Sequence, residues 1–132
     1  MGVIIDTGIF IRAERIKAEA WRDRLPRGEG GAIASISVSE LLVGYHLATE
    51  PHVAARRQAF IEDILGFIPV VAFDTGAARL HARLRAGLRK AGKTVGAHDL
   101  IIAATALSLG WDVLTFNAAE FRQVEGLGVR EV

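Results

Sequence analysis

Cysteine is absent from the 132 residues, which excludes disulfide bonds and thiolate metal sites and fits a cytoplasmic location. Long hydrophobic runs are also missing. No stretch of about eighteen uncharged apolar residues occurs, so we expect no helix that spans a membrane. The apolar residues 1–11 contain Asp6 and have no basic flank or cleavage site. We therefore expect that they are not a signal peptide.

A large excess of charge is lacking as well. Lys and Arg number 16 and Asp and Glu number 15, which leaves a net charge of +1. Any affinity for nucleic acid must therefore come from local clusters of cations. Apolar residues, in contrast, make up 51% of the chain, and the mean hydropathy is +0.30. We expect a single domain over residues 1–132, with some apolar surface covered by a second copy or another protein.

Short runs rich in Val and Ile alternate with helical patterns, which is typical of β-α-β units and a parallel sheet. The pattern predicts strands at residues 3–5, 32–36, 68–73 and 112–116, and a weaker fifth strand at 129–132. It predicts helices at residues 9–25, 37–48, 52–66, 74–90 and 97–109. Asp74 is the expected N-cap of the fourth helix. The fifth is apolar almost all round and should be the most buried.

Three acids occupy related places in this predicted order. Asp6 ends the first strand, Glu40 opens the helix after the second, and Asp99 opens the buried helix before the fourth. In an open parallel sheet, strand ends and the helix starts that follow them meet along one edge, where ligands bind. We therefore expect the three carboxylates to converge there. Their mutual repulsion favours a bound cation, and oxygen ligands without Cys favour Mg²⁺, or Mn²⁺, over zinc.

Each acid also has a purely structural interpretation. Ser37 and Glu40 have the spacing of a capping box, Asp99 lies in a first helical turn where the helix dipole favours an acid, and Asp6 can cap the helix that follows it. Together these interpretations leave unexplained why an acid ends an otherwise apolar strand beside a nearly all-apolar helix.

Four blocks of sequence resemble the ordered motifs of PIN domains, and specifically of the VapC toxins. They are Val-Ile-Ile-Asp-Thr at residues 3–7, Ser-Glu-Leu-Leu-Val-Gly at 39–44, His-Asp-Leu-Ile-Ile-Ala-Ala-Thr-Ala at 98–106, and Thr-Phe-Asn-Ala-Ala-Glu-Phe at 115–121. Each block alone is a weak motif, but four in the same order at matching separations are specific. The resemblance spans the chain from its first strand to its last.

The resemblance implies an α/β fold that is an α/β/α sandwich with a central parallel sheet of four to five strands. It also implies a Mg²⁺-dependent endoribonuclease, acting as the toxin of a toxin–antitoxin pair, which leaves 5′-phosphate and 3′-hydroxyl ends. Asp6, Glu40 and Asp99 would be its catalytic residues and metal ligands. Members of the family often carry a fourth acid in the last block, where this chain has Asn117 and Glu120. Glu120 is either a further ligand or a solvated acid at a helix end.

The expected mechanism is metal-assisted hydrolysis of RNA, with one or two ions held by Asp6 and Asp99 and with Glu40 as a ligand or as a base acting through water. The expected partners are an RNA substrate, a cognate antitoxin protein and a second copy in a homodimer. Arg79 and Arg83, with the cations that follow them, either track RNA phosphates or form a solvated helix face. A housekeeping PIN nuclease and a PIN-like binding module without catalysis are the alternatives.

Overall fold

A computed structural model describes residues 1–132. Its centre is a five-stranded sheet in which every pairing is parallel and the strand order is β3-β2-β1-β4-β5. The strands are β1 (Gly2–Ile5), β2 (Gly30–Ala34), β3 (Val70–Val71), β4 (Asp112–Thr115) and β5 (Val129–Glu131). The predicted parallel α/β fold is confirmed, including its weakly marked fifth strand.

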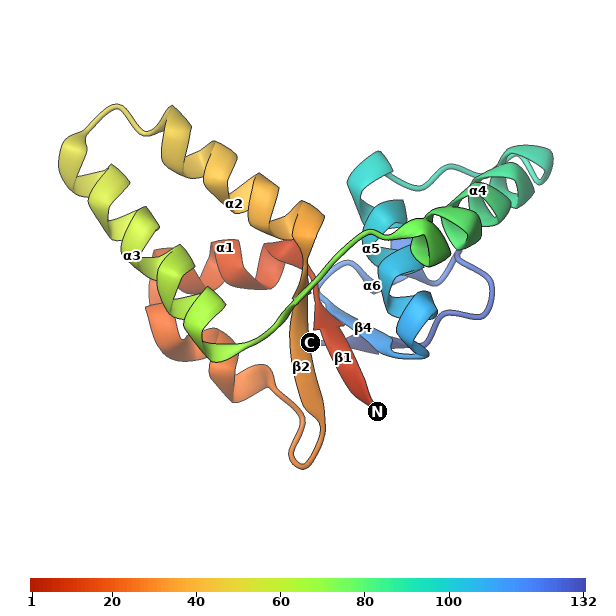
Figure 1. Cartoon of the computed structure of the whole chain (residues 1–132), viewed down its shortest axis with the longest axis horizontal. Helices are drawn as coiled ribbons and strands as arrows, with labels where there is room; N and C mark the ends of the chain where they lie inside the picture. The colour runs from red at the N-terminus through yellow and green to blue at the C-terminus, as the bar shows by residue number, and fades with distance from the viewer.

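Seven helical segments surround the sheet. They are α1 (Thr7–Ile16), the 3₁₀ helix η1 (Ala18–Arg24), α2 (Ser35–Leu47), α3 (Pro51–Phe67), α4 (Thr75–Lys90), α5 (Ala97–Leu109) and α6 (Ala118–Phe121). Figure 1 shows α1, α2 and α3 on one side of the sheet and α4, α5 and α6 on the other, joined by the segment that follows α3. None of the helices has both the length and the apolar character needed to cross a membrane.

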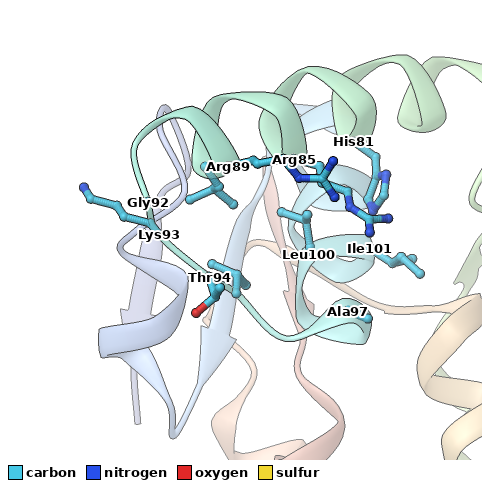
Figure 2. Close-up of a pocket in the computed structure, with 11 residues that line it drawn as sticks. His81, Arg85, Arg89, Gly92, Lys93, Thr94, Ala97, Leu100 and Ile101 are labelled. Atoms are coloured by element: carbon cyan, nitrogen blue, oxygen red, sulfur yellow. The ribbon is translucent and has the colours of Figure 1, made fainter.

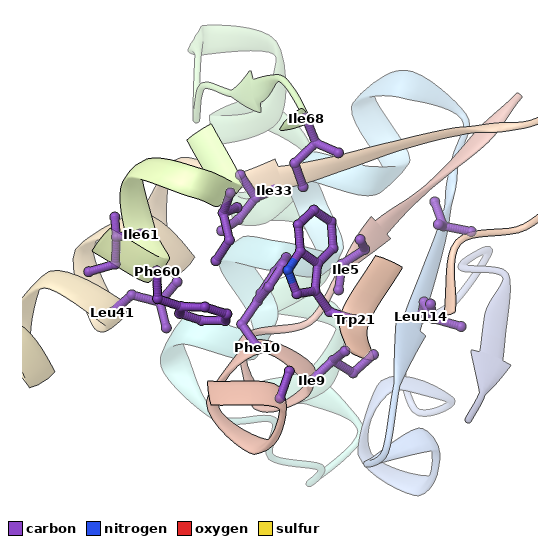
Figure 3. Close-up of a cluster of buried hydrophobic side chains, with 13 residues drawn as sticks. Ile5, Ile9, Phe10, Trp21, Ile33, Leu41, Phe60, Ile61, Ile68 and Leu114 are labelled. Atoms are coloured by element: carbon purple, nitrogen blue, oxygen red, sulfur yellow. The ribbon is translucent and has the colours of Figure 1, made fainter. Parts of the chain in front are cut away.

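Two cores, one on each face of the sheet, make this a three-layer sandwich. Side chains alternate across a strand: in β1, Val3 and Ile5 enter the first core, whereas Ile4 enters the second. The first core is rich in large side chains and packs α1, η1 and α3 against the sheet (Figure 3). The second core is rich in alanine and packs α5, which carries six buried residues and is the most buried helix, as predicted.

The predicted helix over residues 9–25 is wrong in one respect. It breaks at Lys17, whose backbone is extended with φ −155°, and continues as the 3₁₀ helix η1. In one continuous helix, Phe10 and Trp21 would lie about 16 Å apart along the axis. The break lets the ring of Trp21, which is fully buried, pack 5.3 Å from the ring of Phe10. Burial of these rings in the first core therefore overrides the helical pattern.

Two predicted strands differ from expectation: β2 lies two residues earlier than predicted, and β3 is shorter than predicted. Residues 35 and 36 begin α2 instead of extending β2, and the stretch over residues 68–73 contributes only Val70–Val71 to the sheet. Phe73 and Val70 are exposed there, so this edge of the sheet lacks the burial that would order a longer strand. The long helices fit better: α5 has the predicted bounds, and Asp74 caps α4 by accepting a hydrogen bond from the backbone N–H of Ala77.

The strand order places a switch point beside β1. The chain passes from β1 to β2 and β3 on one side, then returns to β4 and β5 on the other. In open parallel sheets, ligands bind outside the carboxyl ends of the strands at such a point. The ends of β1 and β4 are therefore where a site is expected.

Candidate active site

Asp6 stands at this switch point, directly after β1. It is 8% exposed, and its Oδ2 accepts a hydrogen bond of 2.7 Å from the hydroxyl of Thr115, the last residue of β4. The same hydroxyl accepts a bond of 2.8 Å from the backbone N–H of Asn117. Thr115, at the end of β4, thereby fixes the orientation of the Asp6 carboxylate at the end of the neighbouring strand β1.

Glu40 reaches the same region from α2. Its Oε1 accepts a hydrogen bond of 2.9 Å from the hydroxyl of Thr7, and Thr7 is also bonded to the hydroxyl of Ser37 at 2.7 Å. On the other side, Nδ1 of His98 lies 3.4 Å from Oε2 of Glu40. The carboxylate is thus oriented by residues far from it in sequence.

The capping-box interpretation of Ser37 and Glu40 is wrong. Helix α2 begins at Ser35, and the residue in the N-cap position is Ala34, which makes no side-chain cap. Ser37 is therefore inside the helix, and it is fully buried against Thr7. Asp6 occupies the N-cap position of α1 but makes no side-chain cap either, because its carboxylate is turned to Thr115.

Asp99 lies in the first turn of α5, and Glu120 lies beside it. Glu120 accepts hydrogen bonds from the backbone N–H of Gly96 at 2.6 Å and from the side-chain amide of Asn117 at 2.7 Å. It also accepts one from the carboxyl of Asp99 when Asp99 is protonated. Glu120 is therefore not a freely solvated acid at a helix end. It joins α6 to the start of α5, next to one of the three acids singled out from the sequence.

We call these four residues, Asp6, Glu40, Asp99 and Glu120, the acidic edge. Burial raises the pKa of Asp99 to about 7, and the charges of Asp6, Glu120 and Glu40 add to the rise. Burial also raises the pKa of Asp6, against the opposing effect of the Thr115 hydrogen bond. The bond from Gly96, with that from Asn117, lowers the pKa of Glu120. The folded chain thus holds four carboxylates close together, with Asp6 buried and Asp99 partly buried, and their ionisation has a free-energy cost.

The side chains of the acidic edge do not form a finished metal cage. No group of three or more His, Asp or Glu side chains stands in an arrangement that could hold an ion. Each of Asp6, Glu40 and Glu120 is instead turned to its own hydrogen-bond donors, which keep the like charges apart. The donor set nevertheless fits a hard divalent cation, because it consists of carboxylate oxygens with hydroxyl oxygens beside them and has no thiolate.

Three residues of this region position the acids in a way that the sequence-based prediction lacks: Thr7 and Thr115 have no role in it, and Ser37 has only that of a helix cap. Their hydroxyls position the acids through contacts 30 to 109 residues apart in sequence. The sequence feature that could have pointed to two of them is local: Thr7 directly follows Asp6 at the end of one predicted strand, and Thr115 lies at the end of another. His98 makes a further contact of this kind, since it approaches Glu40 of another helix.

Comparisons with known proteins agree on one family. Residues 3–127 match the PIN domain. Ribonuclease VapC1 of Rickettsia felis is 34% identical over 135 residues, which cover 100% of this chain and 97% of the relative. The tRNA(fMet)-specific endonuclease VapC of Shigella flexneri is 34% identical over 125 residues, covering 94% and 92%. A crystal structure of DNA-bound VapBC from Salmonella typhimurium superposes with a TM-score of 0.86 at 28% identity, covering 99% and 98%.

Proposed function

The chain belongs to the PIN domain family, and from this premise we propose that its acidic edge is the catalytic centre of an endoribonuclease. The protein is a ribonuclease of the VapC kind, the toxin of a toxin–antitoxin pair. One observation supports the assignment of the site: four carboxylates, one directly after β1 and the others on α2, α5 and α6, lie close enough at the switch point of the sheet for their charges to raise the pKa values of Asp6 and Asp99. No Lys or Arg side chain forms an ion pair with any of them.

Asp6 and Asp99 would hold one or two divalent ions, Mg²⁺ with Mn²⁺ as a substitute, and Glu40 would act as a third ligand or as a base through water. When bound, the metal would activate water and neutralise charge on the phosphate that is attacked. Water adds to phosphorus and the bond to the 3′-oxygen breaks, which leaves a 3′-hydroxyl and a 5′-phosphate. Thr115, Thr7 and Ser37 hold the acids in place for this step.

The partners follow from the same premise. Exposed apolar side chains gather on α1 and α2, among them Ile11, Ile16, Leu42, Val43 and Leu47. A hollow of about 280 Å³ between α1, α2 and α3 includes Glu40 and Leu47 in its lining. We propose that residues 1–132 form a single domain, that a second copy covers part of this surface, and that a helix of the antitoxin lies in the hollow. An antitoxin cation placed among the carboxylates would inhibit by competing with the metal.

The decisive experiment incubates the purified protein with tRNA(fMet) and, separately, with total bacterial RNA in Mg²⁺, in Mn²⁺ and in EDTA. We expect cleavage that requires the metal and new 5′-phosphate ends in the products. Asp6→Asn should remove the activity, whereas Glu62→Gln, which neutralises an exposed acid of α3, should retain it. A PIN-like binding module would bind RNA but cut none under any of these conditions.

Growth of a bacterial host tests the toxin assignment separately. Induction of the wild-type gene should arrest growth, and co-expression of the adjacent small reading frame should restore it. Equal growth of hosts carrying wild type and Asp6→Asn would leave a housekeeping nuclease as the better assignment. Arrest by both would point to an effect that needs no catalysis.

A further inference from the structure

The cations of the chain are unevenly distributed. Residues 75–98, which comprise α4 and the loop to the start of α5, contain six Lys and Arg and no Asp or Glu. The remainder of the chain has ten Lys and Arg against fifteen acids. None of the six cations forms an ion pair, whereas Arg22, Arg57 and Arg130 elsewhere each pair with a carboxylate. We call residues 75–98 the basic segment.

Helical geometry divides the basic segment into two faces. Leu80, Leu84 and Leu88 follow one another every four residues along α4, so they form one apolar line. At about 100° per residue, Arg79 and Arg83 fall on one side of this line, and Arg85 and Arg89 fall on the other. The sequence treats these arginines as one stripe, but the fold gives the two pairs different surroundings.

The second pair lines a pocket at the start of α5, whereas Arg83 lines a different pocket, which reaches Leu107 near the end of the same helix. The first of these pockets, of about 520 Å³, lies between α4, the loop after it and the first turns of α5. Figure 2 shows His81, Arg85 and Arg89 gathered along α4 above Ile101, with Lys93 at the other end of the pocket. Apolar side chains complete the lining: Leu88, Val95, Leu100 and Ile101. We call it the α4–α5 pocket.

The combination of an apolar wall and unpaired guanidinium groups matches one kind of ligand. A nucleotide has a flat base that packs on apolar surface and a phosphate that pairs with arginine. A pocket of several hundred Å³ is the size that small ligands occupy in proteins. A peptide made only of acidic residues would pair with the arginines but would leave the apolar wall uncovered.

The α4–α5 pocket and the acidic edge lie on two sides of the same helix start. Thr94 and Ala97 line the pocket, and Gly96 between them donates its N–H to Glu120. Asp99 follows Ala97 by two residues, so it projects about 200° further around α5. A strand of RNA that crosses the start of α5 therefore meets both places in succession.

We propose that the α4–α5 pocket is a substrate subsite, which holds a nucleotide that neighbours the scissile phosphate through Arg85 and Arg89. The inference rests on the proposed ribonuclease function and refines it. It selects these two arginines over Arg79 and Arg83, and it assigns the pocket a nucleotide of single-stranded RNA and not an acidic protein segment.

The test compares three double variants that each remove two positive charges. They are Arg85→Gln with Arg89→Gln, Arg79→Gln with Arg83→Gln, and the matched control Arg24→Gln with Arg27→Gln, whose exposed arginines belong to η1 and the turn after it. The first readout is the Kd of a fluorescent single-stranded RNA in EDTA, where no cleavage occurs, as a function of salt. We expect the first variant to bind roughly 20-fold more weakly at about 0.1 M salt, with a log–log salt slope reduced by about 0.7 for each phosphate that is no longer neutralised. The control should match wild type.

A second readout distinguishes a subsite for one nucleotide from non-specific electrostatic attraction between RNA and the cations of the protein. The RNA that spans the mapped cut is shortened by one nucleotide at a time from each end, and KM is measured for each length. Wild type should show a stepwise rise in KM when the nucleotide in the pocket is removed. The Arg85 and Arg89 variant should lack that step, because its subsite is already impaired, while the Arg79 and Arg83 variant should keep it.

The outcomes are distinguishable. If wild type cuts no RNA in Mg²⁺ or Mn²⁺, both the proposed function and this subsite fail. If wild type cuts RNA but all three variants share its Kd and its step in KM, the subsite alone is wrong. If RNA binding is unchanged but the complex with the co-encoded antitoxin weakens in the first variant, the pocket binds a protein, which also overturns the inference.

Discussion

The acidic edge and the basic segment lie on either side of the start of α5, and the chain builds them in opposite ways. The four acids come from positions 6, 40, 99 and 120, and the fold of the whole sheet is needed to bring them together. The six cations come from one helix and the loop after it. Hydroxyl and amide groups hold the acids, whereas no carboxylate holds the cations. The whole fold is therefore needed to assemble the first group, whereas the periodicity of a single helix places most of the second.

The two regions also differ in how far their charges reduce the stability of the folded state. Burial and mutual repulsion raise the pKa values of Asp6 and Asp99, so ionising these groups opposes folding when no cation is bound. The cations of α4 are mostly exposed, where water and salt screen their repulsion. Changes in the acidic edge should therefore alter both catalysis and stability, whereas changes in the basic segment should alter RNA affinity and its dependence on salt.

The largest effect should come from Asp6→Asn and Asp99→Asn. Each should reduce RNA cleavage to background, because each removes a proposed metal ligand. In EDTA, each should leave the free energy of unfolding equal or higher, by about 1 kcal/mol for Asp99, since one repulsive charge is removed and solvent screens part of the gain. Thermal melts in EDTA and in Mg²⁺ check this, with Glu62→Gln as the control. A clear loss of stability in EDTA would make these acids structural.

Glu40→Gln should lower cleavage strongly while leaving stability near that of wild type, because Gln still accepts the hydrogen bond from Thr7. Since α2 has no capping box, Glu40→Ala should cost no cap free energy. It should lose no more than the bond to Thr7, which is worth about 1 kcal/mol. Cleavage assays and urea unfolding of both variants test this. Near-normal cleavage by Glu40→Gln would remove Glu40 from the catalytic set.

Thr115→Val tests whether position is what the acidic edge needs. Val has nearly the same shape but no hydroxyl, so Asp6 loses its donor and the N–H of Asn117 loses its acceptor. We expect cleavage to fall by about 10–100-fold, as for other groups that orient metal ligands. Stability should fall by about 1–3 kcal/mol, because polar groups are left unpaired in a buried place. Thr115→Ser should restore both properties. If the Val variant cleaves normally, the hydroxyl does not position Asp6.

The sequence predicts these two regions unequally, for physical reasons. Asp74 and the glycine after α5, Gly110 with φ 67°, are local signals, so the bounds of α4 and α5 are predictable. The apolar strand that ends in Asp6 is a local signal too. The break at Lys17 is not, because it depends on the packing of Trp21 against Phe10. The bond from Thr115 to Asp6 spans 109 residues, and no local pattern encodes it. The family resemblance implies the acids as site residues, but it does not imply the hydroxyls that hold them.

The pKa of Asp99 gives the acidic edge a pH dependence that the basic segment lacks. In the folded protein this pKa is about 7, and the ordinary value is 3.8. Between these values the folded chain keeps a proton that the unfolded chain has released, so stability falls as pH rises from about 4 to about 7. Melts in EDTA should therefore show that the advantage of Asp99→Asn over wild type grows from about pH 5 to about pH 8. An advantage that does not change with pH would contradict the raised pKa.

Saturating Mg²⁺ should reverse the fall in wild-type stability with rising pH. A carboxylate binds the ion only after losing its proton, so the stabilisation of wild type by Mg²⁺ should increase from about pH 5 to about pH 8. Asp99→Asn should show little stabilisation at either pH. The Arg85 and Arg89 variant, whose change lies outside the acidic edge, should follow wild type in both series of melts.

The smallest effect should come from Glu120→Gln, which separates the positioning of α5 from the charge of the acidic edge. Gln can still accept the hydrogen bond from Gly96 through its amide oxygen, so the start of α5 should stay in place. It removes one of the charges that raise the pKa of Asp99, so that pKa should fall. We therefore expect near-normal cleavage at about pH 8 and relatively higher cleavage than wild type at about pH 6, where Asp99 of wild type is largely protonated. The pH profile of kcat/KM, measured beside Glu62→Gln, reports the shift. Complete loss of cleavage at every pH would instead make Glu120 a metal ligand, because a residue that acts only through the pKa of Asp99 cannot be essential once Asp99 is ionised.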